Sequence, residues 1–528
     1  MQDLKHESCE ALFERFQDTH VLISSEQFAR WTLASVFPST STQTTGVRYA
    51  LERDYQSKGA MLVNNLATKV TQALFPQDSA FFEIGQTQEM LDMAQQLGAD
   101  AKAAGSLFAG IESRASARVF LNAGYSALTH AMKLLIVSGN ALLFRDPDSK
   151  RFHTYSVRDY SVRRDGSGTV LVIILKERIA HIDLPDEFRI RLGWDSKEDY
   201  EDCILYTKIQ RKMLNGRPIY EVSQEVEGGH SIGVPSIYPE ALCPYIVLTW
   251  NLIAGEHYGR GHIEDFAGDI ARLSELSESS LLYEIEMMKL VNVTDPAAGI
   301  DIDDMANAEV GEYVAGKSGV AGNGVVAHEG GNAQKLQAVL NDIQQLMQQL
   351  SIAFMYTGNT RDAERVTAEE IRANISEANQ TLGGIYANIS EVLHVRLAHI
   401  LSVEEAPELL PLLNTQAISL DVAVGVASLN RQSQVEKLQY LANAINVVVP
   451  SVQQASPRFN MDLVVDMLCQ GFGIDREALS YTPEQLQQLQ QQQDQSAQQS
   501  MMNAAPGGDG GVDPQTAALN SQQLGLTQ

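Results

Sequence analysis

The sequence predicts an α+β protein that is predominantly helical. Two observations carry this prediction. Apolar residues recur at helical spacing through most of the first 140 residues and again from His262 onward. Between these parts, from Ala141 to Glu227, β-branched and aromatic residues become frequent, and two Asx-Gly pairs separate runs of alternating character. With 528 residues, the chain is long enough to bury a large core.

The first part of the chain predicts four helices. Proline cannot continue a helix, so Pro38 and Pro76 are expected to end two of them. We expect these helices over residues 7–16, 26–37, 47–75 and 110–135.

The middle part predicts two hairpins and a separate strand. The pairs Asp165-Gly166 and Asn215-Gly216 are typical of tight turns, which need positive φ values. The strands that flank them are expected over residues 152–164 and 169–179, and over residues 204–213 and 217–226. A last apolar strand is expected over residues 245–250.

An acidic helix is expected from His262 to about residue 290. Its outer face carries seven acids but only Arg272 and Lys289 as bases; the acids are Glu264, Asp265, Asp269, Glu275, Glu278, Glu284 and Glu286. Residues 294–331 are rich in glycine and acids, and we expect loops and short strands there. A second helix begins at Gln334, with an apolar stripe at i, i+3, i+4, i+7 spacing and a glutamine-rich opposite face.

The remaining part predicts further helices. After a break at residues 356–365, Thr367 and Glu370 form a capping box that opens a helix to about residue 401. Gly383-Gly384 should kink or break it, because each glycine costs about 1 kcal/mol relative to alanine. A glutamine-rich helix is expected to start at Thr482, and residues 503–528 lack any apolar period and should be disordered.

Charge and cysteine content exclude several classes of protein. The net charge of −27 argues against a protein that binds nucleic acid or an anionic membrane through its overall charge. The longest aliphatic run, residues 170–175, is too short to span a bilayer, and no signal peptide is apparent, so we expect a soluble intracellular protein. The cysteines are far apart and are expected to be reduced and packed: Cys9, Cys203, Cys243 and Cys469.

Three motifs suggest chemistry but lack its structural context. Residues 311–318 match GxxxxGK[ST], yet no buried strand precedes them and further glycines follow. Residues 229–233 match GxSxG, but Pro235 and Pro239 forbid the helix that a nucleophile elbow needs. Residues 255–265 gather histidine and acids without metal-ligand spacing, so we expect a turn with Glu264 and Asp265 in the first helical turn. The sequence therefore predicts no catalytic residue, cofactor site or metal site.

Several blocks of sequence resemble one known family. In order they are residues 64–76, 135–144 (LIVSGNALLF), 243–245 (CPY), 255–265, 365–372 (RVTAEEIR) and 381–384 (TLGG). Together they resemble the portal, or head-to-tail connector, proteins of short-tailed, podovirus-type bacteriophages, over about residues 5–490. The resemblance implies the portal fold, with wing, stem, clip, crown and C-terminal helical barrel, in a ring of twelve copies at one capsid vertex.

The family's parts can be laid on the expected segments. Residues 1–261 would form the wing, 262–290 and 334–354 the two stem helices, and 291–333 the clip between them. Residues 355–366 would be the channel loop, 367–401 a long kinked wing helix, and 402–480 the rest of wing and crown. The barrel helix would occupy residues 481–502 and the disordered tail residues 503–528.

The resemblance also implies a function and partners. The ring would pass double-stranded DNA during packaging and ejection without binding it tightly. It would dock the packaging ATPase, which is the terminase large subunit, and later the tail adaptor or tubular protein, and it would contact scaffolding and major capsid proteins. It would be part of the virion, assembled in the bacterial cytoplasm, with no enzymatic activity and no membrane contact.

Two groups of residues are candidates for contact with DNA. Glu264, Asp265, Asp269, Glu275 and Glu278 would line a channel wall that repels phosphate. Arg361 and Arg365 lie on or beside the channel loop and would touch phosphates intermittently, or instead pair with Asp362, Glu364 or Glu369. Two alternatives stay open: a P-loop NTPase, including the packaging motor itself, and an adaptor ring of the virion that does not contact DNA.

Overall fold

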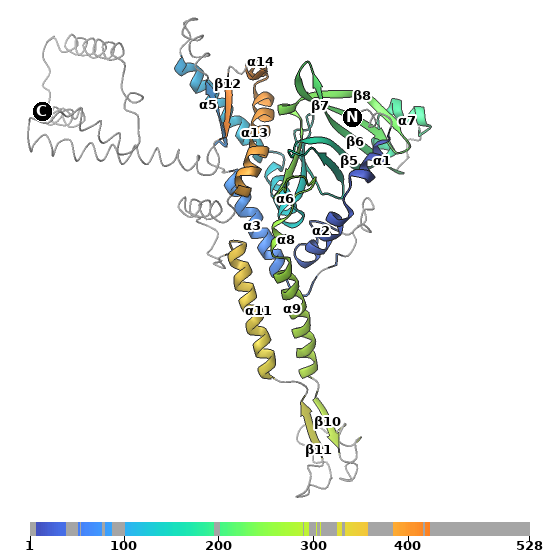
Figure 1. Ribbon diagram of the computed structural model, residues 1–528, viewed down its shortest axis with the longest axis vertical. Helices are drawn as coiled ribbons and strands as arrows, with labels where there is room; N and C mark the ends of the chain where they lie inside the picture. Colours follow the sequence, from blue (N-terminus) through green and yellow to red (C-terminus); the bar gives the residue numbers. More distant parts are fainter. Residues whose placement is uncertain are drawn as a thin grey trace, which may run out of the picture. The chain divides into compact units, whose positions relative to one another are not determined.

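The computed structural model describes residues 7–38, 51–52, 54–75, 80–86, 101–194, 201–288, 290–294, 303, 307, 325–329, 333–356, 384–414 and 418–422. All of them belong to one compact unit, Met1–Leu429. Helices and antiparallel sheets share one large apolar core, which confirms the predicted α+β class (Figure 1).

Helices dominate the first 140 residues. They are α1 (Cys9–Phe16), α2 (Thr19–Trp31), α3 (Lys58–Leu74), α5 (Ala101–Ala117), a 3₁₀ turn (Arg118–Phe120) and α6 (Gly124–Ser138). Helix α3 buries an apolar face from Leu62 to Leu74, and it packs against α6. It ends before Pro76, as the sequence predicted.

Three of the predicted helices have different limits in the structure. The helix expected over residues 26–37 is α2, which begins earlier because the Asp18 side chain accepts hydrogen bonds from the backbone of His20 and Val21. It also ends earlier, at Trp31, because Thr32 leaves the helical conformation, so Pro38 does not end it. The helix expected from residue 47 begins at Lys58. The prediction of one helix over residues 110–135 is wrong: α5 and α6 are separate, because Asn122 and Ala123 have positive φ values of 52° and 60°.

Two antiparallel sheets follow. The first has the order β3-β2-β9, with β2 Asn140–Arg145, β3 Phe152–Tyr155 and β9 Tyr245–Thr249. The second has the order β4-β5-β6-β7-β8, with β4 Tyr160–Arg164, β5 Val170–Ala180, β6 Asp202–Leu214, β7 Arg217–Val226 and β8 His230–Pro239. Short helical segments join the strands: 3₁₀ turns at His181–Asp183 and Glu240–Leu242, and α7 at Asp186–Leu192.

Both predicted hairpins are present, but the single strand expected over residues 152–164 is wrong: a turn in which Asp159 accepts a hydrogen bond from Ser156 divides it into β3 and β4, which lie in different sheets. At the turn between β6 and β7, Asn215 and Gly216 have φ values of 51° and 78°, as a two-residue turn of this type requires. The turn between β4 and β5 is longer: Asp165 accepts hydrogen bonds from the backbone of Ser167 and Thr169, and the positive φ, 87°, is at Gly168.

A pair of long helices leads to a two-stranded hairpin. The elements are α8 (His262–Asp265), α9 (Ala267–Met287), β10 (Leu290–Thr294), β11 (Val325–Glu329) and α11 (Ala333–Ala353). Helix α9 packs beside α11, and β10 pairs antiparallel with β11 (Figure 1). Helix α11 confirms the prediction for residues 334–354, whereas the helix expected to start at His262 is interrupted at Phe266 and ends at Met287.

The last described elements return to the first part of the chain. They are α13 (Gly384–Glu405), α14 (Leu409–Asn414) and β12 (Ile418–Val422), which pairs antiparallel with β1 (Phe82–Gln86). Helix α13 packs against α5 through a buried face that includes Leu393, Leu397 and Leu401. The capping box at Thr367 and the predicted barrel helix and disordered tail lie outside the described residues.

Three of the four cysteines, Cys9, Cys203 and Cys243, are free thiols buried in the core, as the sequence predicted; Cys469 lies outside the described residues. Burial raises the pKa of the Cys9 thiol to about 12 and that of Cys243 to about 11, so both stay protonated at neutral pH. Among the helices that the structure describes, none has the length and apolar character needed to cross a membrane.

Candidate functional site: an acidic helix pair and its anchors

The predicted acidic surface lies on α8 and α9. Asp265, Asp269, Glu275 and Glu278 have exposed side chains. Glu264 is half-buried, and its carboxylate lies 2.9 Å from Nη1 of Arg260, which also binds Glu256 at 2.8 Å. The structure therefore presents four of the five predicted acids to solvent and neutralises the fifth locally.

The only arginine of α9 does little to reduce this negative charge. Nη2 of Arg272 lies 2.5 Å from Oδ2 of Asp342 on α11, so its charge is matched by an acid of the neighbouring helix. Arg272 is exposed and Asp342 is partly exposed, and such surface pairs contribute about 0 to 1 kcal/mol. The pair joins the two helices, and the exposed acids of α9 keep their charge.

Apolar residues hold α9 against α11 over part of their length. Ile270 and Leu273 of α9 and Ile343 and Leu350 of α11 are all buried in the main core. Beyond Ser280 several apolar side chains are exposed instead: Leu281, Leu282 and Ile285 of α9, and Met288 directly after it. The described part of the chain thus leaves the far end of α9 with an apolar surface that its own packing does not cover.

His262 joins the start of this helix pair to its end. The centroid of its buried ring lies 5.1 Å from the ring centroid of Phe266 and 4.7 Å from that of Phe354. Its Nε2 lies 3.2 Å from the carbonyl oxygen of Ala353. Burial lowers the pKa of His262, and the Ala353 carbonyl raises it by a smaller amount. Because a carbonyl oxygen only accepts, the neutral ring donates from Nε2, and this hydrogen bond ties α8 to the end of α11.

Helix α3 holds the end of α11. Asn65 Nδ2 donates to the carbonyl oxygens of Phe354 and Met355 at 3.2 and 3.1 Å, and Lys69 Nζ donates to Met355 at 2.7 Å. Amide and ammonium donors at a helix C-terminus satisfy carbonyls that the helix leaves unpaired. The ammonium of Lys58 also lies 4.1 Å from the ring centroid of Tyr356. The chain is therefore held firmly up to Tyr356.

A glycine-rich corner connects α8 to the sheets. The buried side chain of Asn140 donates to the carbonyl oxygen of Gly259 and accepts from its backbone N–H, each at 2.7 Å. Gly139 has a φ of 76°, and a Cβ at Gly261 would lie 2.9 Å from three backbone atoms of residues 136, 137 and 139. The turn predicted for residues 255–261 is confirmed, and these contacts fix where α8 begins.

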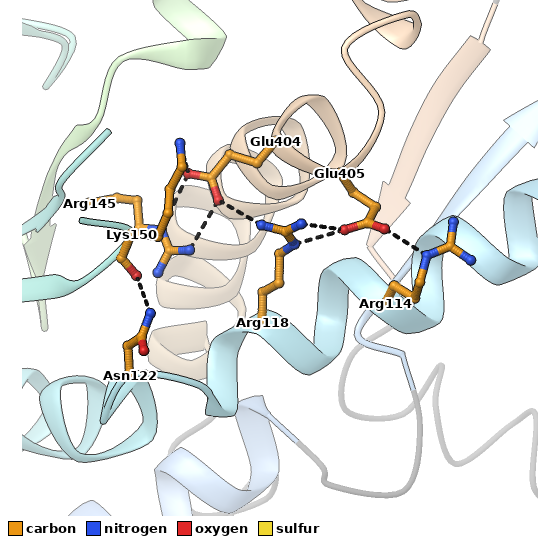
Figure 2. Close-up of polar contacts among 7 residues, drawn as sticks. All are labelled: Arg114, Arg118, Asn122, Arg145, Lys150, Glu404 and Glu405. Atoms are coloured by element: carbon orange, nitrogen blue, oxygen red, sulfur yellow. Dashed lines mark hydrogen bonds and ion pairs between the residues drawn. The ribbon is translucent and has the colours of Figure 1, made fainter. Parts of the chain in front are cut away.

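A second anchor holds the end of α13 (Figure 2). Glu405 binds Arg114 Nε and Arg118 Nη2, each at 2.6 Å, and these hydrogen bonds lower the pKa of Glu405. Glu404 lies 3.0 Å from Arg145 and 3.7 Å from Lys150. Acids at a helix C-terminus oppose the helix dipole, so the four bases offset an unfavourable placement.

The sequence did not single out the residues of these anchors. Asn65 and Lys69 lie in the block of residues 64–76 that carries the resemblance, and their spacing of four, which puts both side chains on one face of the helix, is a signal that could have indicated them. Glu404 and Glu405 have no such local signal, because their partners are more than 250 positions away.

The motifs that suggested enzymatic chemistry find no support in the described residues. Ser231 of the GxSxG match lies on β8, opposite Glu225 in an antiparallel pair, where no nucleophile elbow can form. In the part of the chain that the structure covers, no three metal-ligating side chains come together. Arg361, Arg365 and the GxxxxGK[ST] match at residues 311–318 lie outside the described residues.

Comparisons with known proteins extend over most of the chain. Residues 9–479 match the family described as bacteriophage head to tail connecting protein. The chain is 38% identical over 479 residues to the portal protein of Pseudomonas phage phiKMV, which covers 90% of this chain and 92% of that protein. It is 28% identical over 501 residues to the portal protein of Escherichia phage T7, with 92% and 90% covered.

A structural likeness is also found. A chain from the neck of an empty GTA particle has a TM-score of 0.39 and 12% identity, with 80% of this chain and 90% of that chain covered. This likeness is too weak to add to the sequence relationship.

Proposed function

Because the chain belongs to the family of bacteriophage head-to-tail connecting proteins, it is a structural portal component and not an enzyme, and we propose how its parts serve that function. Its relatives are the portal proteins of short-tailed phages, and a role in packaging the genome follows from the family. The observation that carries this most directly is 38% identity to one such protein over 90% of the chain. The place of such a protein is the head–tail junction of the virion.

We propose that twelve copies form a ring at one capsid vertex, assembled in the host cytoplasm. In this ring, α8, α9 and α11 would be the stem, residues 291–333 the clip, and the sheets with their helices the wing. The exposed apolar end of α9, from Leu281 to Met288, supports assembly, because an uncovered apolar surface on a long helix is typical of a contact with another chain.

The proposed DNA channel runs along the stem. Asp269, Glu275 and Glu278 project from α9 into solvent. Each close contact of a cation with a phosphate releases counterions and strengthens binding, so a cationic wall would slow DNA that has to slide. An acidic wall avoids this retention, and the exposed Asp265 would extend it to the start of the stem, whereas Arg260 offsets the charge of Glu264 there.

The proposed channel loop begins where α11 ends. Asn65 and Lys69 hold Phe354 and Met355, so the first residue of the proposed loop, residues 355–366, is fixed to α3. An anchored start suits a loop that meets moving DNA, because the force on the loop would pass into α3 and the core. We propose that Arg361 and Arg365 touch the phosphates intermittently from this loop.

The proposed partners follow from this placement. The packaging ATPase, which is the terminase large subunit, would dock on the ring during packaging, and the tail adaptor would replace it afterwards. Scaffolding and major capsid proteins would meet the wing. These interactions are proposed from the family, and they give the ring its position between head and tail.

Electron microscopy of the purified chain, with native mass spectrometry for the number of copies, tests the ring. Closed rings of twelve with an axial hole are the expected result, and compact monomers would overturn the proposal.

A packaging reaction in capsids assembled without this chain tests the adaptor alternative. We expect no DNA uptake, whereas uptake followed by leakage would indicate an adaptor. ATP turnover that Lys317→Ala abolishes would indicate the NTPase alternative.

A further inference from the structure

A cavity of about 660 Å³ lies between the two sheets and α13. The turn before β5, the end of β9 and one face of α13 form its walls, and its described lining includes Arg164, Thr169, Tyr220, Trp250, Asn388 and Arg396. Its volume falls within the range of small-molecule sites, roughly 300–1,000 Å³. Neither the acidic stem nor the anchors described above use this cavity.

Arg164 brings a buried positive charge to the wall of the cavity. Its side chain donates to the carbonyl oxygens of His257 at 3.1 Å and Gly168 at 2.8 Å. The third nitrogen, Nη2, is buried and has no partner among the described residues, and Arg164 is only 7% exposed. Burial lowers the pKa of Arg164. A buried guanidinium without a counter-charge is costly, so an anion is the group that this site lacks.

A second unpaired donor lines the same cavity. Trp250 is fully buried, and within the described part of the chain its indole Nε1–H has no acceptor. A buried tryptophan normally donates this hydrogen to a partner. Arg396 of α13 adds another cation, with its Cζ 5.6 Å from the ring centroid of Tyr220. Two arginines and Trp250 therefore line one space.

The negative charge at the cavity is already matched. Of the described residues that line it, Glu240 is the one carboxylate, and Arg211 binds it through Nε at 3.0 Å and Nη2 at 3.2 Å. That bidentate pair satisfies Glu240 and leaves Arg164 and Arg396 without an acid from the lining. The cavity is thus locally cationic in a chain whose net charge is −27.

We propose that this cavity binds a phosphate oxyanion. Guanidinium groups match the geometry of phosphate oxygens and form charge-assisted hydrogen bonds with them, and the indole N–H would supply a neutral donor. The remaining lining includes the polar side chains of Thr169 and Asn388, and the volume of the cavity leaves room for a substituent on the phosphate. The oxyanion would come from free phosphate or from the backbone of a nucleic acid.

The first experiment titrates inorganic phosphate into the purified full-length protein by calorimetry, with chloride holding the ionic strength constant. Saturable binding is expected. The variant Arg396→Gln should weaken it about ten- to hundredfold, which corresponds to one charge-assisted hydrogen bond. The matched control is Arg163→Gln, because Arg163 is the exposed neighbour of Arg164 and is absent from the lining. Arg163→Gln should bind as the unaltered protein does.

Two further measurements keep the proposal decisive. Trp250→Phe removes the N–H donor but retains an aromatic ring, and it should weaken phosphate binding. Electron microscopy of the variant checks that its particles are unchanged. A short DNA duplex replaces phosphate in a second titration: binding of the duplex alone, lost in Arg396→Gln, would identify nucleic acid as the source. No saturable binding of either probe, or equal binding by Arg396→Gln and Arg163→Gln, would overturn the proposal.

Discussion

The guanidinium of Arg145 on β2 lies 3.0 Å from the carboxylate of Glu404 at the end of α13, although 259 positions of sequence separate the two residues. Their side chains are only 2% and 9% exposed. The pair is part of the group of charges that Figure 2 shows, with Arg118 and Lys150 on the same carboxylate. It holds the end of α13 against β2.

Replacing Glu404 with leucine should destabilise the protein by about 3–5 kcal/mol, because Arg145 would keep a buried charge without its partner. The double variant Arg145→Met, Glu404→Leu should recover part of this loss. Urea denaturation followed by tryptophan fluorescence measures both effects. The exposed Glu408→Leu is the matched control and should cost less than about 0.5 kcal/mol. Equal costs for Glu404→Leu and Glu408→Leu would show that the buried pair does not contribute.

Replacing each of two glycines near the start of the stem with alanine should change the stability of the protein in opposite directions. A Cβ at Gly261 would lie 2.9 Å from three backbone atoms, so Gly261→Ala should cost about 1–3 kcal/mol through forced shifts. A Cβ at Gly268 in α9 meets nothing within 4 Å, and Gly268→Ala should add up to about 1 kcal/mol by favouring the helix. Thermal unfolding of the two variants compares them directly, and a loss of stability in both would contradict this account.

Acid should destabilise the protein through His394. Burial lowers the pKa of His394 to about 3, and its ring lies against Phe75 and Phe81. Because the unfolded chain takes up a proton more readily than the folded one, stability is present above pH 6.5 and is lost as the pH falls toward 3. The full shift corresponds to about 4–5 kcal/mol.

Comparing the pH dependence of the unfolding free energy between the unaltered protein and His394→Phe isolates the contribution of His394. This comparison is needed because other groups, such as Glu405, also make the protein less stable in acid. Unfolding free energy measured from pH 7 to pH 4 should fall less steeply in the variant. His20→Phe, at an exposed histidine, is the control and should leave the slope unchanged. Equal slopes for His394→Phe and the unaltered protein would exclude His394 as the cause.

Local signals predicted the elements that depend on neighbouring residues. The turn at Asn215-Gly216 and the helix from Ala333 to Ala353 both follow from a few adjacent positions, and the structure has both. The break between α5 and α6 was missed because Asn122 and Ala123 adopt positive φ, which their residue types do not demand. Tertiary contacts also decide the interruption at Phe266, where the ring packs against Phe354 from the far end of α11.

The candidate site was predicted only in part for the same reason. The helical spacing of apolar residues predicted that the acids of α9 lie on its exposed face, because exposure along one helix depends mainly on the helical period. The anchors formed by Asn65 and Glu404 unite residues more than 250 positions apart, and no pattern along one segment indicates such pairs.

Reversing the charge on the proposed channel wall should hinder DNA movement. In the triple variant Asp269→Lys, Glu275→Lys, Glu278→Lys, each new lysine could contact a phosphate, so packaging should slow and the delay should shrink as salt is raised. Packaging rate in a reconstituted system at two salt concentrations measures this. The exposed Glu187→Lys on α7 is the single-site control. If the triple variant packages at the normal rate at low salt, these acids do not line the path of the DNA.

Removing the proposed loop cations should change DNA retention without changing the ring. Arg361→Ala with Arg365→Ala deletes two contacts to phosphate, so packaged DNA should leak faster and the salt dependence of retention should weaken, by roughly one counterion for each arginine. Nuclease protection of packaged DNA measures retention, and electron microscopy checks the rings.

A second double variant tests the anchor of the loop. Because Asn65 and Lys69 hold the chain at the start of this loop, Asn65→Ala with Lys69→Ala should weaken DNA retention in the same direction while both arginines remain. The exposed Arg217→Ala is the matched control. Normal retention in both double variants would remove the loop from the mechanism, whereas loss in the arginine variant alone would show that the loop acts without its anchor.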